Sequence, residues 1–540
     1  MAVSRRTFLG RGSAALAGAA LAPGALVRDQ RPVVRWAART AADMPEPDVA
    51  ALLWQRAAFG ARPGDVAAAR QVGAEAWIEA QLAFTKLPDP YTDAALVALG
   101  LTSYGLTAAE LLAGNNGNPA QHLVNGTLIR QWFSPRQLYE VLVDFWNDHF
   151  TVFVGQADAG RVRIIDDRTV ARTHALGRFK DILTASAHSP AMLMFLDNDS
   201  NQARKINENY AREIMELHTL GVAVNGVPYT EDDIKEVARC FTGWNWVRQG
   251  GGGRGGAVGD YQYRDGIHDQ NAKRVLGQAI PARQGEQDGV QVIDMLCRHD
   301  ATPRFIATKL IRRFVCDDPE ADVPGLVDRV AAVYKAKDGD IKSIVRTILT
   351  SAEFAGAFGR YGGRYSRPLD FAARAARALG AQPADFDALS AFTTSRRGRT
   401  GAGMLALAGH LPFYWSTPDG YPDVKVAWAS SSGLLARWNY ALDLVGSVDR
   451  GAGGRPAAGG VESPLNVIDQ TPSDRKTAGA VVDYWIDRIL SRPMLAADRA
   501  VLVDYVTAGG TEFDTLSADQ RARIRELVAL ILDSPYALWR

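Results

Sequence analysis

Apolar residues recur every three or four positions through most of this chain, and that spacing predicts amphipathic helices. The segments that show the spacing most clearly are 63–82, 135–149, 230–241, 302–315, 323–334, 341–349, 367–379, 477–490 and 517–532. The strict alternation of apolar and polar residues that marks a half-buried strand is scarce. We therefore predict an all-α or mainly α fold, a large multi-helix body with long loops and little or no sheet.

Two low-complexity segments interrupt the helical pattern. One, residues 249–259, is mostly glycine and lies between aromatic clusters, so it is either a loop over a site or a plain surface insertion. The other, residues 451–464, is rich in Gly, Ala and Pro and predicts a linker. The resulting organisation is an export leader (1–27), a linker (28–46), an N-terminal helical part (47–248), a glycine-rich loop with a His-Asp motif (249–275), a second helical part (276–450), a linker (451–475) and a C-terminal helical segment (476–540).

The first residues are typical of a twin-arginine export leader. Ser4-Arg5-Arg6-Thr7-Phe8-Leu9 is followed by an apolar stretch rich in Ala and Gly. That stretch contains Arg11 and Pro23 and is too weakly apolar to span a membrane stably. We expect export by the twin-arginine pathway and a periplasmic or extracellular location.

Charge and cysteine content narrow the functional classes. Lysines and arginines number 61 against 60 acidic residues, which gives no indication of binding to nucleic acid or to an anionic membrane. Three cysteines without a C-x-x-C pair form no disulfide framework, and Cys297 and Cys316 are expected to be dispensable.

The segment 207–221 carries the densest polarity of the chain and is predicted to form one helix. At about 100° per residue, its polar residues divide between two faces: Asn209, Arg212, Glu213 and Glu216 on one, Asn207 and His218 on the other. One interpretation is a solvated helix in which Arg212 pairs with Glu216. The other is a site with Glu208 and Glu213 as catalytic carboxylates and Asn209 and Arg212 as binding residues.

His149 falls on the apolar face of the predicted 135–149 helix, so its imidazole needs a buried partner. That partner is either a backbone carbonyl or structural carboxylate, or a functional group such as Glu213, Glu216 or His218. The functional arrangement would be an acid/base pair or a metal site made by His149, Glu213 and His218. Neither H-E-x-x-H nor E-x-x-H occurs, which disfavours the zincin and ferritin types of metal site. The cofactor is left open, with a metal as the candidate.

Other candidates lie in predicted loops. His268 beside Asp269 suits a general base with its orienting carboxylate, with Lys273 as a binding residue, or else a turn held by the Asp side chain. Asp419 occupies a Pro- and Gly-containing turn and is a candidate binding residue, and Trp244 is a candidate for stacking on a sugar or for packing in the core. The sequence contains no G-x-S-x-G, no P-loop and no G-x-G-x-x-G after a strand.

Several ordered blocks resemble the bacterial family catalogued as domain of unknown function 1800, over nearly the whole chain after the leader. These blocks are Arg56-Ala57-Ala58-Phe59-Gly60, Asp144-Phe145-Trp146-Asn147-Asp148-His149-Phe150, the 207–221 segment, Phe241-Thr242-Gly243-Trp244, His268-Asp269 with Lys273 and Leu276-Gly277, Phe305-Ile306-Ala307-Thr308-Lys309-Leu310 and Thr417-Pro418-Asp419-Gly420-Tyr421-Pro422. The chain departs from the family in its long glycine tract and in Tyr421, where many relatives have tryptophan. The resemblance implies an exported protein, often encoded beside a sulfatase-like family catalogued as domain of unknown function 1501, and it brings no mechanism.

Three functional hypotheses follow. The first, slightly favoured, is a hydrolase of a carbohydrate or other envelope or extracellular polymer that uses carboxylates of the 208–216 segment with His149, His218 or His268. The second is a non-catalytic binding or assembly protein that acts with the sulfatase-like partner. The third is a metal-dependent redox enzyme, which twin-arginine export would suit.

Overall fold

The computed structural model describes residues 36, 39–114, 117–222, 229–250, 256–394, 403–446, 465–507 and 518–540. The predicted export leader lies outside these residues, as do the centre of the glycine tract and most of the predicted 451–475 linker.

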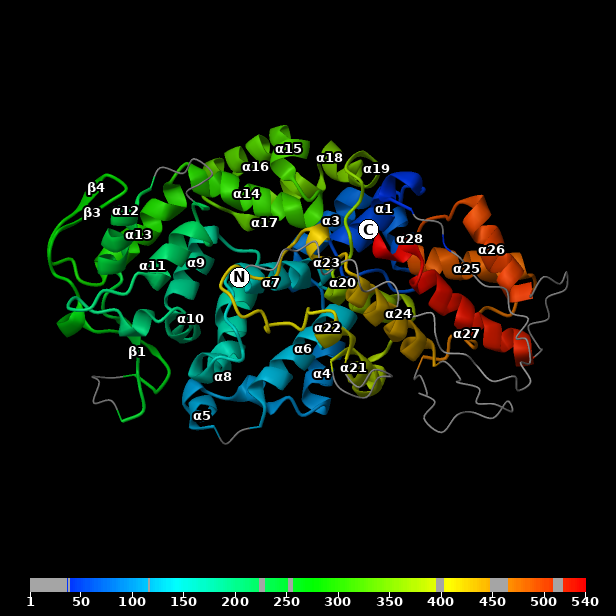
Figure 1. Ribbon diagram of the computed structural model, residues 1–540, viewed down its shortest axis with the longest axis horizontal. Coiled ribbons are helices and arrows are strands. Elements are labelled where there is room, and N and C mark those ends of the chain that lie inside the picture. Colours follow the sequence, from blue (N-terminus) through cyan, green and yellow to red (C-terminus); the bar gives the residue numbers. More distant parts are fainter. Residues whose placement is uncertain are drawn as a thin grey trace, which may run out of the picture.

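Helices dominate the architecture, as predicted (Figure 1). The helices before the strands are α1 (Val49–Arg56), α2 (Asp65–Val72), α3 (Ala74–Leu82), α4 (Pro90–Ala98), α5 (Ala108–Ala113), α6 (Pro119–Phe133), α7 (Gln137–His149), α8 (Ala157–Asp166), α9 (Phe179–Ala187), α10 (Pro190–Phe195), α11 (Asn209–Glu216) and α12 (Glu231–Cys240). The helices after the strands are α13 (Gln287–Arg298), α14 (Ala301–Phe314), α15 (Pro319–Asp322), α16 (Pro324–Ala336), α17 (Ile341–Leu349), α18 (Ala352–Ala355), α19 (Ala357–Arg360), α20 (Pro368–Ala378), α21 (Phe386–Thr393), α22 (Met404–Leu407), α23 (Lys425–Trp428), α24 (Ser431–Val445), α25 (Ala478–Leu490), α26 (Ala496–Thr507), α27 (Ala518–Leu532) and α28 (Pro535–Leu538).

The described sheet structure consists of two short antiparallel hairpins. β1 (Trp244–Trp246) pairs with β2 (Tyr261–Tyr263), and β3 (Lys273–Val275) pairs with β4 (Gln278–Ile280). The aromatic clusters on either side of the glycine tract therefore form the two strands of one hairpin, in which Trp244 lies opposite Tyr263 and Trp246 opposite Tyr261. Aromatic pairs across two strands stabilise such a hairpin. The mainly α fold with little sheet is confirmed.

Two predicted helices are shorter or divided in the structure. The 63–82 segment forms α2 and α3, separated at Gly73, whose φ of 86° is outside the helical range. The 207–221 segment was predicted as one helix, but α11 ends at Glu216. Beyond it the Leu220 N–H donates to the Met215 carbonyl at 2.7 Å, and Gly221 adopts a φ of 87°. Hence His218 lies in the turn after the helix, because the left-handed glycine reverses the chain there.

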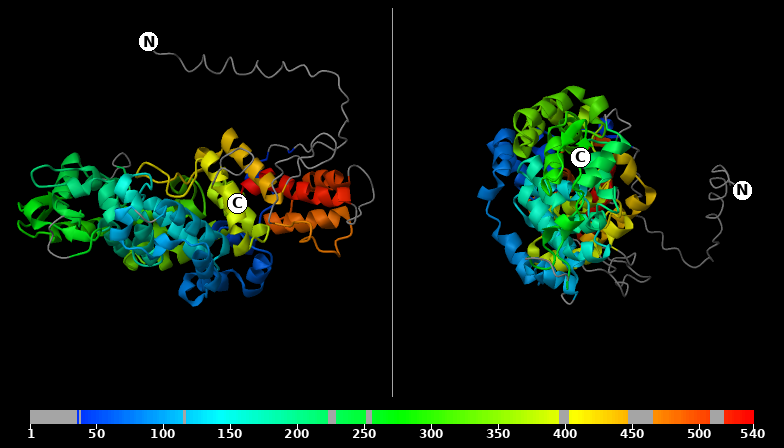
Figure 2. Two further views of the ribbon diagram at one scale, coloured as in Figure 1. Left: turned by 90° about the horizontal axis from the view of Figure 1, so that it is seen from below. Right: turned by 90° about the vertical axis from the view of Figure 1, so that its left-hand side faces the viewer.

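The helices are arranged in an elongated body. The two hairpins and α11 to α13 lie at one end, and α25 to α27 lie at the other (Figures 1 and 2). One buried apolar cluster extends from Ala41 to Ala537, so early and late segments share a core. The end of the chain returns to the middle of the body, where the buried Arg540 guanidinium lies 2.7 Å from Asp370 of α20.

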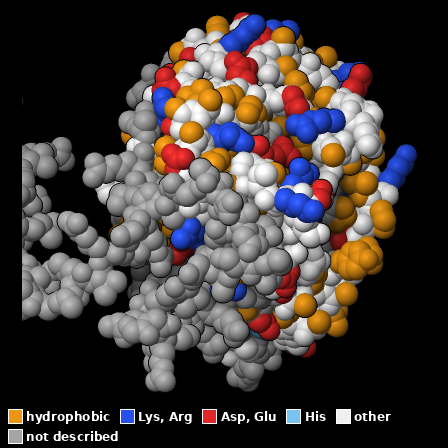
Figure 3. Space-filling model, turned by 90° about the vertical axis from the view of Figure 1, so that its right-hand side faces the viewer, with side chains coloured by type: hydrophobic (Ala, Val, Ile, Leu, Met, Phe, Trp, Pro, Cys, Tyr) orange, Lys and Arg blue, Asp and Glu red, His pale blue; other side chains and the backbone are white. Residues whose placement is uncertain are grey.

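The surface at the α25 to α27 end carries acidic and basic side chains intermingled with apolar ones (Figure 3). An example of this mixing is the ion pair between Arg499 and Asp483, at 2.5 Å. None of the helices among the described residues has the length and apolarity needed to cross a membrane.

Candidate functional site

A charged cavity of about 270 Å³ lies where the end of α7, the end of α11, the middle of α14 and the 417–423 loop meet. The residues around it are Phe145, Asp148, His149, Glu216, Leu217, Val222, Phe305, Lys309, Arg312, Arg313, Arg367, Asp419, Tyr421, Pro422 and Asp423. Four of the sequence blocks that are far apart along the chain therefore contribute to one cavity. We call it the charged cavity below.

Gly420 fixes the 417–423 loop against α7. A Cβ atom at this position would lie 2.0 Å from the carbonyl oxygen of Asp148, and the φ of Gly420 is 75°. Only glycine tolerates both this approach and this backbone conformation. The close contact sets Asp419 and Tyr421 at the wall of the cavity next to Asp148.

Asp148 is held by a buried arginine that it shares with other carboxylates. Arg367 contacts Asp148 at 3.2 Å, Asp144 at 2.5 Å and Asp370 at 3.0 Å. Burial, together with the negative charge of Asp144, raises the pKa of Asp148, although the charge of Arg367 opposes that rise. Asp148 can therefore hold a proton at a pH where an exposed aspartate is ionised.

Glu213 has a pKa raised to about 7. Burial is the largest cause, the negative charges of Glu216 and Asp419 add to it, and Arg212 opposes it. Since Glu216 and Asp419 both line the charged cavity, Glu213 lies within electrostatic reach of that cavity. A carboxyl with this pKa exchanges a proton readily near neutral pH.

Asp419 is the exposed one among the carboxylates that line the charged cavity. Its Oδ1 accepts hydrogen bonds from Trp415 Nε1 at 2.8 Å and from the Thr417 hydroxyl at 2.5 Å. These two donors fix the orientation of the carboxylate at the edge of the cavity.

His149 and His218 are both buried beside the cavity, with ring centroids 5.9 Å apart. His149 Nε2 lies 3.1 Å from the carbonyl oxygen of His218, so Nε2 carries the proton and donates it. Burial, with the charges of Lys309 and His218, holds the pKa of His149 well below its ordinary value, so the ring is neutral. In this tautomer His149 Nδ1 is an acceptor, and it has no hydrogen-bond partner among the described residues. Of the partners considered for His149 from the sequence, the structure shows a backbone carbonyl, that of His218.

Lys309 brings an amine to the same cavity from α14. Burial lowers its pKa to about 8, and the negative charge of Asp148 opposes that shift. Its Nζ lies 5.5 Å from the centroid of the Phe305 ring, over the ring face.

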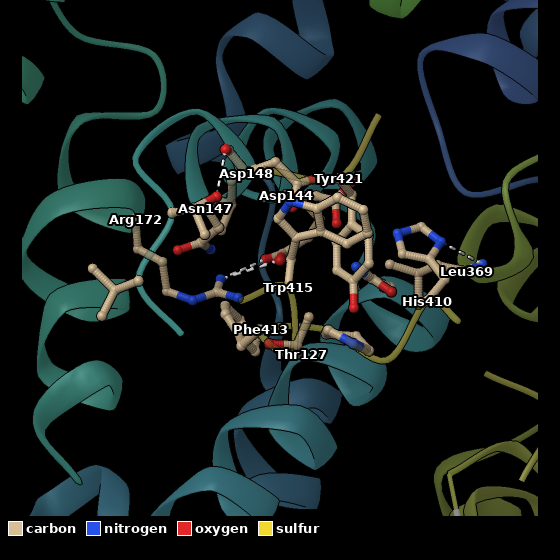
Figure 4. A pocket seen from close by; sticks show the side chains of 16 residues that line it. Thr127, Asp144, Asn147, Asp148, Arg172, Leu369, His410, Phe413, Trp415 and Tyr421 are labelled. Atoms are coloured by element: carbon tan, nitrogen blue, oxygen red, sulfur yellow. Dashed lines mark hydrogen bonds and ion pairs between the residues drawn. The ribbon is translucent and has the colours of Figure 1, made fainter. Parts of the chain in front are cut away.

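A smaller space of about 20 Å³ adjoins the charged cavity and shares Asp148 and Tyr421 with it (Figure 4). Glu140 and Arg172, which line it, form an ion pair at 3.1 Å. The side-chain amide of Gln131, also in its wall, is buried and has no partner among the described residues. A space of this volume holds about one water molecule.

The His-Asp motif is not part of the charged cavity. His268 Nε2 and Lys273 Nζ both contact Asp288 of α13, at 3.0 Å and 2.6 Å, and the side chains of all three are fully buried. The His268 Nδ1 faces the Thr242 carbonyl oxygen at 2.7 Å. Asp269 does not orient His268. It accepts hydrogen bonds from Arg239 and Asn271 instead, and these lower its pKa to about 2 although burial acts in the opposite direction.

The structure therefore gives His268, Asp269 and Lys273 a structural environment. Because Asp288 neutralises Lys273 and engages His268, this network joins β3, the loop before it and α13. Of Glu213, His149 and His268, only His149 is among the residues that line the charged cavity.

The other predicted residues serve the packing of α11 and of the hairpin. Arg212 pairs with Glu231 at 2.7 Å as well as with Glu216 at 3.5 Å and Glu208 at 3.7 Å. Asn209 donates to the Leu196 carbonyl at 3.2 Å. Trp244 is fully buried against Phe241 and Tyr261, which leaves no ring face for a sugar.

Sequence analysis missed several residues of the cavity, namely Asp148, Lys309, Arg312, Arg313, Arg367 and Asp423. Asp148 and Lys309 stand in the blocks that carried the family resemblance. The available signal was the position of Asp148 next to His149 and of Lys309 in an otherwise apolar helix stretch.

Among the residues that the structure describes, no three His, Cys, Asp or Glu side chains are grouped so that they could hold a metal ion. The predicted trio of His149, Glu213 and His218 does not form such a group. All three cysteines are buried and free.

Comparison with known proteins gives one match. The model of the family described as Protein of unknown function (DUF1800) matches residues 52–539. No curated protein and no solved structure matches the chain.

Proposed function

This chain belongs to the family described as Protein of unknown function (DUF1800), and from its charged cavity we propose that it is a hydrolase of a carbohydrate or another envelope or extracellular polymer. The observation that carries the proposal is the position of Glu213, which is half-buried within electrostatic reach of the cavity residues Glu216 and Asp419; burial and these two charges raise its pKa to about 7. Glu213 is half-buried, whereas Asp419 is exposed, and two carboxyl groups in such different environments suit the roles of acid and base.

In the proposed reaction Glu213 is the general acid and Asp419 the general base. Glu213 gives its proton to the leaving oxygen as the bond from that oxygen to carbon breaks. A water molecule adds its oxygen to the same carbon, and its proton passes to Asp419. The Trp415 and Thr417 hydrogen bonds hold the Asp419 carboxylate in position for that transfer. Water is consumed and no redox partner is needed.

A polymeric substrate is supported by the aromatic residues on the loop that leads to Asp419. Tyr414 is 43% exposed, and Trp415 lies next to it in sequence with its indole bonded to Asp419. An exposed aromatic side chain on the loop that carries a carboxylate suits stacking on a sugar ring. The hydrolase hypothesis thus keeps Glu213 of the 208–216 segment, takes Asp419 in place of a histidine as its second group and leaves out His268.

The experiment is a hydrolysis assay on envelope and exopolymer fractions that measures newly formed chain ends. We expect Glu213→Gln to lower the rate by about 10²-fold, because the amide cannot donate the acid proton. The melting temperature of the variant should not fall below that of the wild type. Glu79→Gln is the matched control, because Glu79 is an exposed carboxylate that does not line the cavity. It forms an ion pair with Arg346 at 2.5 Å. Full activity in Glu213→Gln would overturn the proposal.

The second candidate is a non-catalytic binding or assembly protein that works with a sulfatase-like partner of the domain of unknown function 1501 family. The observation in its favour is that His268, Asp269 and Lys273 form a structural network outside the cavity. The same assay run with and without that partner separates the two, because this candidate binds polymer without producing chain ends. The metal-dependent redox alternative has no ligand group among the described residues to support it.

A further inference from the structure

The positive charges of the charged cavity fall into two classes. Arg313 and Arg367 are buried and neutralised: Arg313 contacts Asp370 at 3.2 Å, and Arg367 contacts Asp144, Asp148 and Asp370. These arginines belong to an internal ion-pair network, so their charge is already used within the protein.

Lys309 and Arg312 form the second class. They stand one helical turn apart on α14 and both line the cavity. Among the residues that the structure describes, Lys309 Nζ has no carboxylate partner and no hydrogen-bond acceptor. Within the described residues, the only hydrogen bond that the Arg312 guanidinium makes runs from Nε to the carbonyl oxygen of Asp317, at 3.0 Å. Both groups are therefore donors without an anionic partner.

The cavity carboxylates do not neutralise this pair directly. Glu216 contacts Arg212 at 3.5 Å, Asp423 pairs with Arg364, and Asp419 accepts from Trp415 and Thr417. Burial is the largest cause of the lowered pKa of Lys309, and repulsion from the neighbouring Arg312 adds to it, while the negative charges of Asp148, Asp419 and Asp423 oppose it. A bound anion would relieve that repulsion.

We propose that Lys309 and Arg312 bind an anionic oxygen group of the ligand, a carboxylate or a sulfate ester. Together with the proposed hydrolysis, on which this step rests, the substrate is then an acidic polymer with one charged sugar unit in the cavity. The cavity, at about 270 Å³, is close to the lower end of the range for ligand pockets and suits a single unit.

The test measures binding rather than cleavage, in the Glu213→Gln background so that the polymer stays intact. The probes are polygalacturonate, dextran sulfate and neutral dextran, titrated at pH 7 and fixed salt. We expect polygalacturonate or dextran sulfate to bind at least about tenfold more tightly than dextran, and Lys309→Met to remove that preference. Comparison of the two acidic polymers identifies the anionic group as carboxylate or sulfate.

Two further variants separate charge from folding. Lys309→Arg retains the charge and should retain the preference, whereas Lys335→Met removes an exposed lysine paired with Asp300 and should change nothing. Equal affinity for dextran and the acidic polymers, or an unchanged preference in a folded Lys309→Met protein, would overturn the inference. Charge-dependent binding by a wild-type protein that produces no chain ends would instead refute only the proposed hydrolysis. Cleavage of a neutral polymer with no acidic preference would refute only this inference.

Discussion

His149 Nε2 lies 3.1 Å from the main-chain oxygen of His218, and this contact fixes the direction in which the His149 imidazole donates. The ring of His218 itself is 1% exposed, and neither of its nitrogens has a partner among the described residues. The two histidines are thus adjacent and similarly buried, but only one makes a hydrogen bond through its ring.

This difference predicts opposite effects of the same substitution. His149→Phe should lower the free energy of unfolding by about 1–3 kcal/mol, because the buried His218 carbonyl loses its donor. His218→Phe should be neutral or stabilising, because it removes polar atoms that are buried without partners. Urea denaturation of both variants measures the effect. A larger loss for His218→Phe than for His149→Phe would contradict the assigned bonding.

Gly420 is predicted to be intolerant of a side chain. Gly420→Ala puts a Cβ 2.0 Å from the Asp148 carbonyl, so the 417–423 loop must move and the activity or polymer binding of the cavity should fall. Gly409→Ala is the control, since Gly409 has a similar φ of 71° and a Cβ added there would meet no atom within 4 Å. It should show only the conformational cost of about 1 kcal/mol. Equal melting temperatures and equal function of the two variants would argue against the close contact.

The raised pKa of Glu213 predicts a pH-dependent stability. The folded protein holds this proton up to about pH 7, whereas an unperturbed glutamate releases it near its ordinary value of 4.5. The protonated group therefore contributes stability that is fully present below about pH 4.5 and is lost as the pH rises through about 7. Unfolding measured from pH 4 to 8 should show a decline across this window in the wild type. The decline should be smaller in Glu213→Gln, and parallel curves would show that Glu213 does not titrate in this way.

Export by the twin-arginine pathway stays a prediction that depends on Arg5 and Arg6. Replacing both with lysine should keep the precursor in the cytoplasm, because the pathway distinguishes the paired guanidinium groups from ammonium groups. Cell fractionation with an antibody to the mature chain measures the distribution. Unchanged export of the double variant would remove the assignment of a periplasmic or extracellular location.

The sequence by itself determined the helical nature of the fold and the family. Apolar spacing predicted α17 at Ile341–Leu349 with its bounds, because helix periodicity and the Asp340 cap are local properties of the chain. The sequence also marked His149, on the apolar face of a predicted helix, and Asp419, in a turn that contains proline and glycine. The length of α11 was predicted less well, since the turn at Gly221 depends on backbone conformation.

Only the tertiary structure decided which polar residues act together. His268 and Asp269 are adjacent in sequence, but Asp288 from α13 takes the histidine and Arg239 takes the aspartate. Lys309 and Asp148 are far apart in sequence, but they line one cavity, where the negative charge of Asp148 acts on the pKa of Lys309. Burial and charge shift a pKa through distances in space, and helix packing sets those distances. Periodicity along the chain specifies which face of a helix is buried. It does not specify which other helix packs against that face.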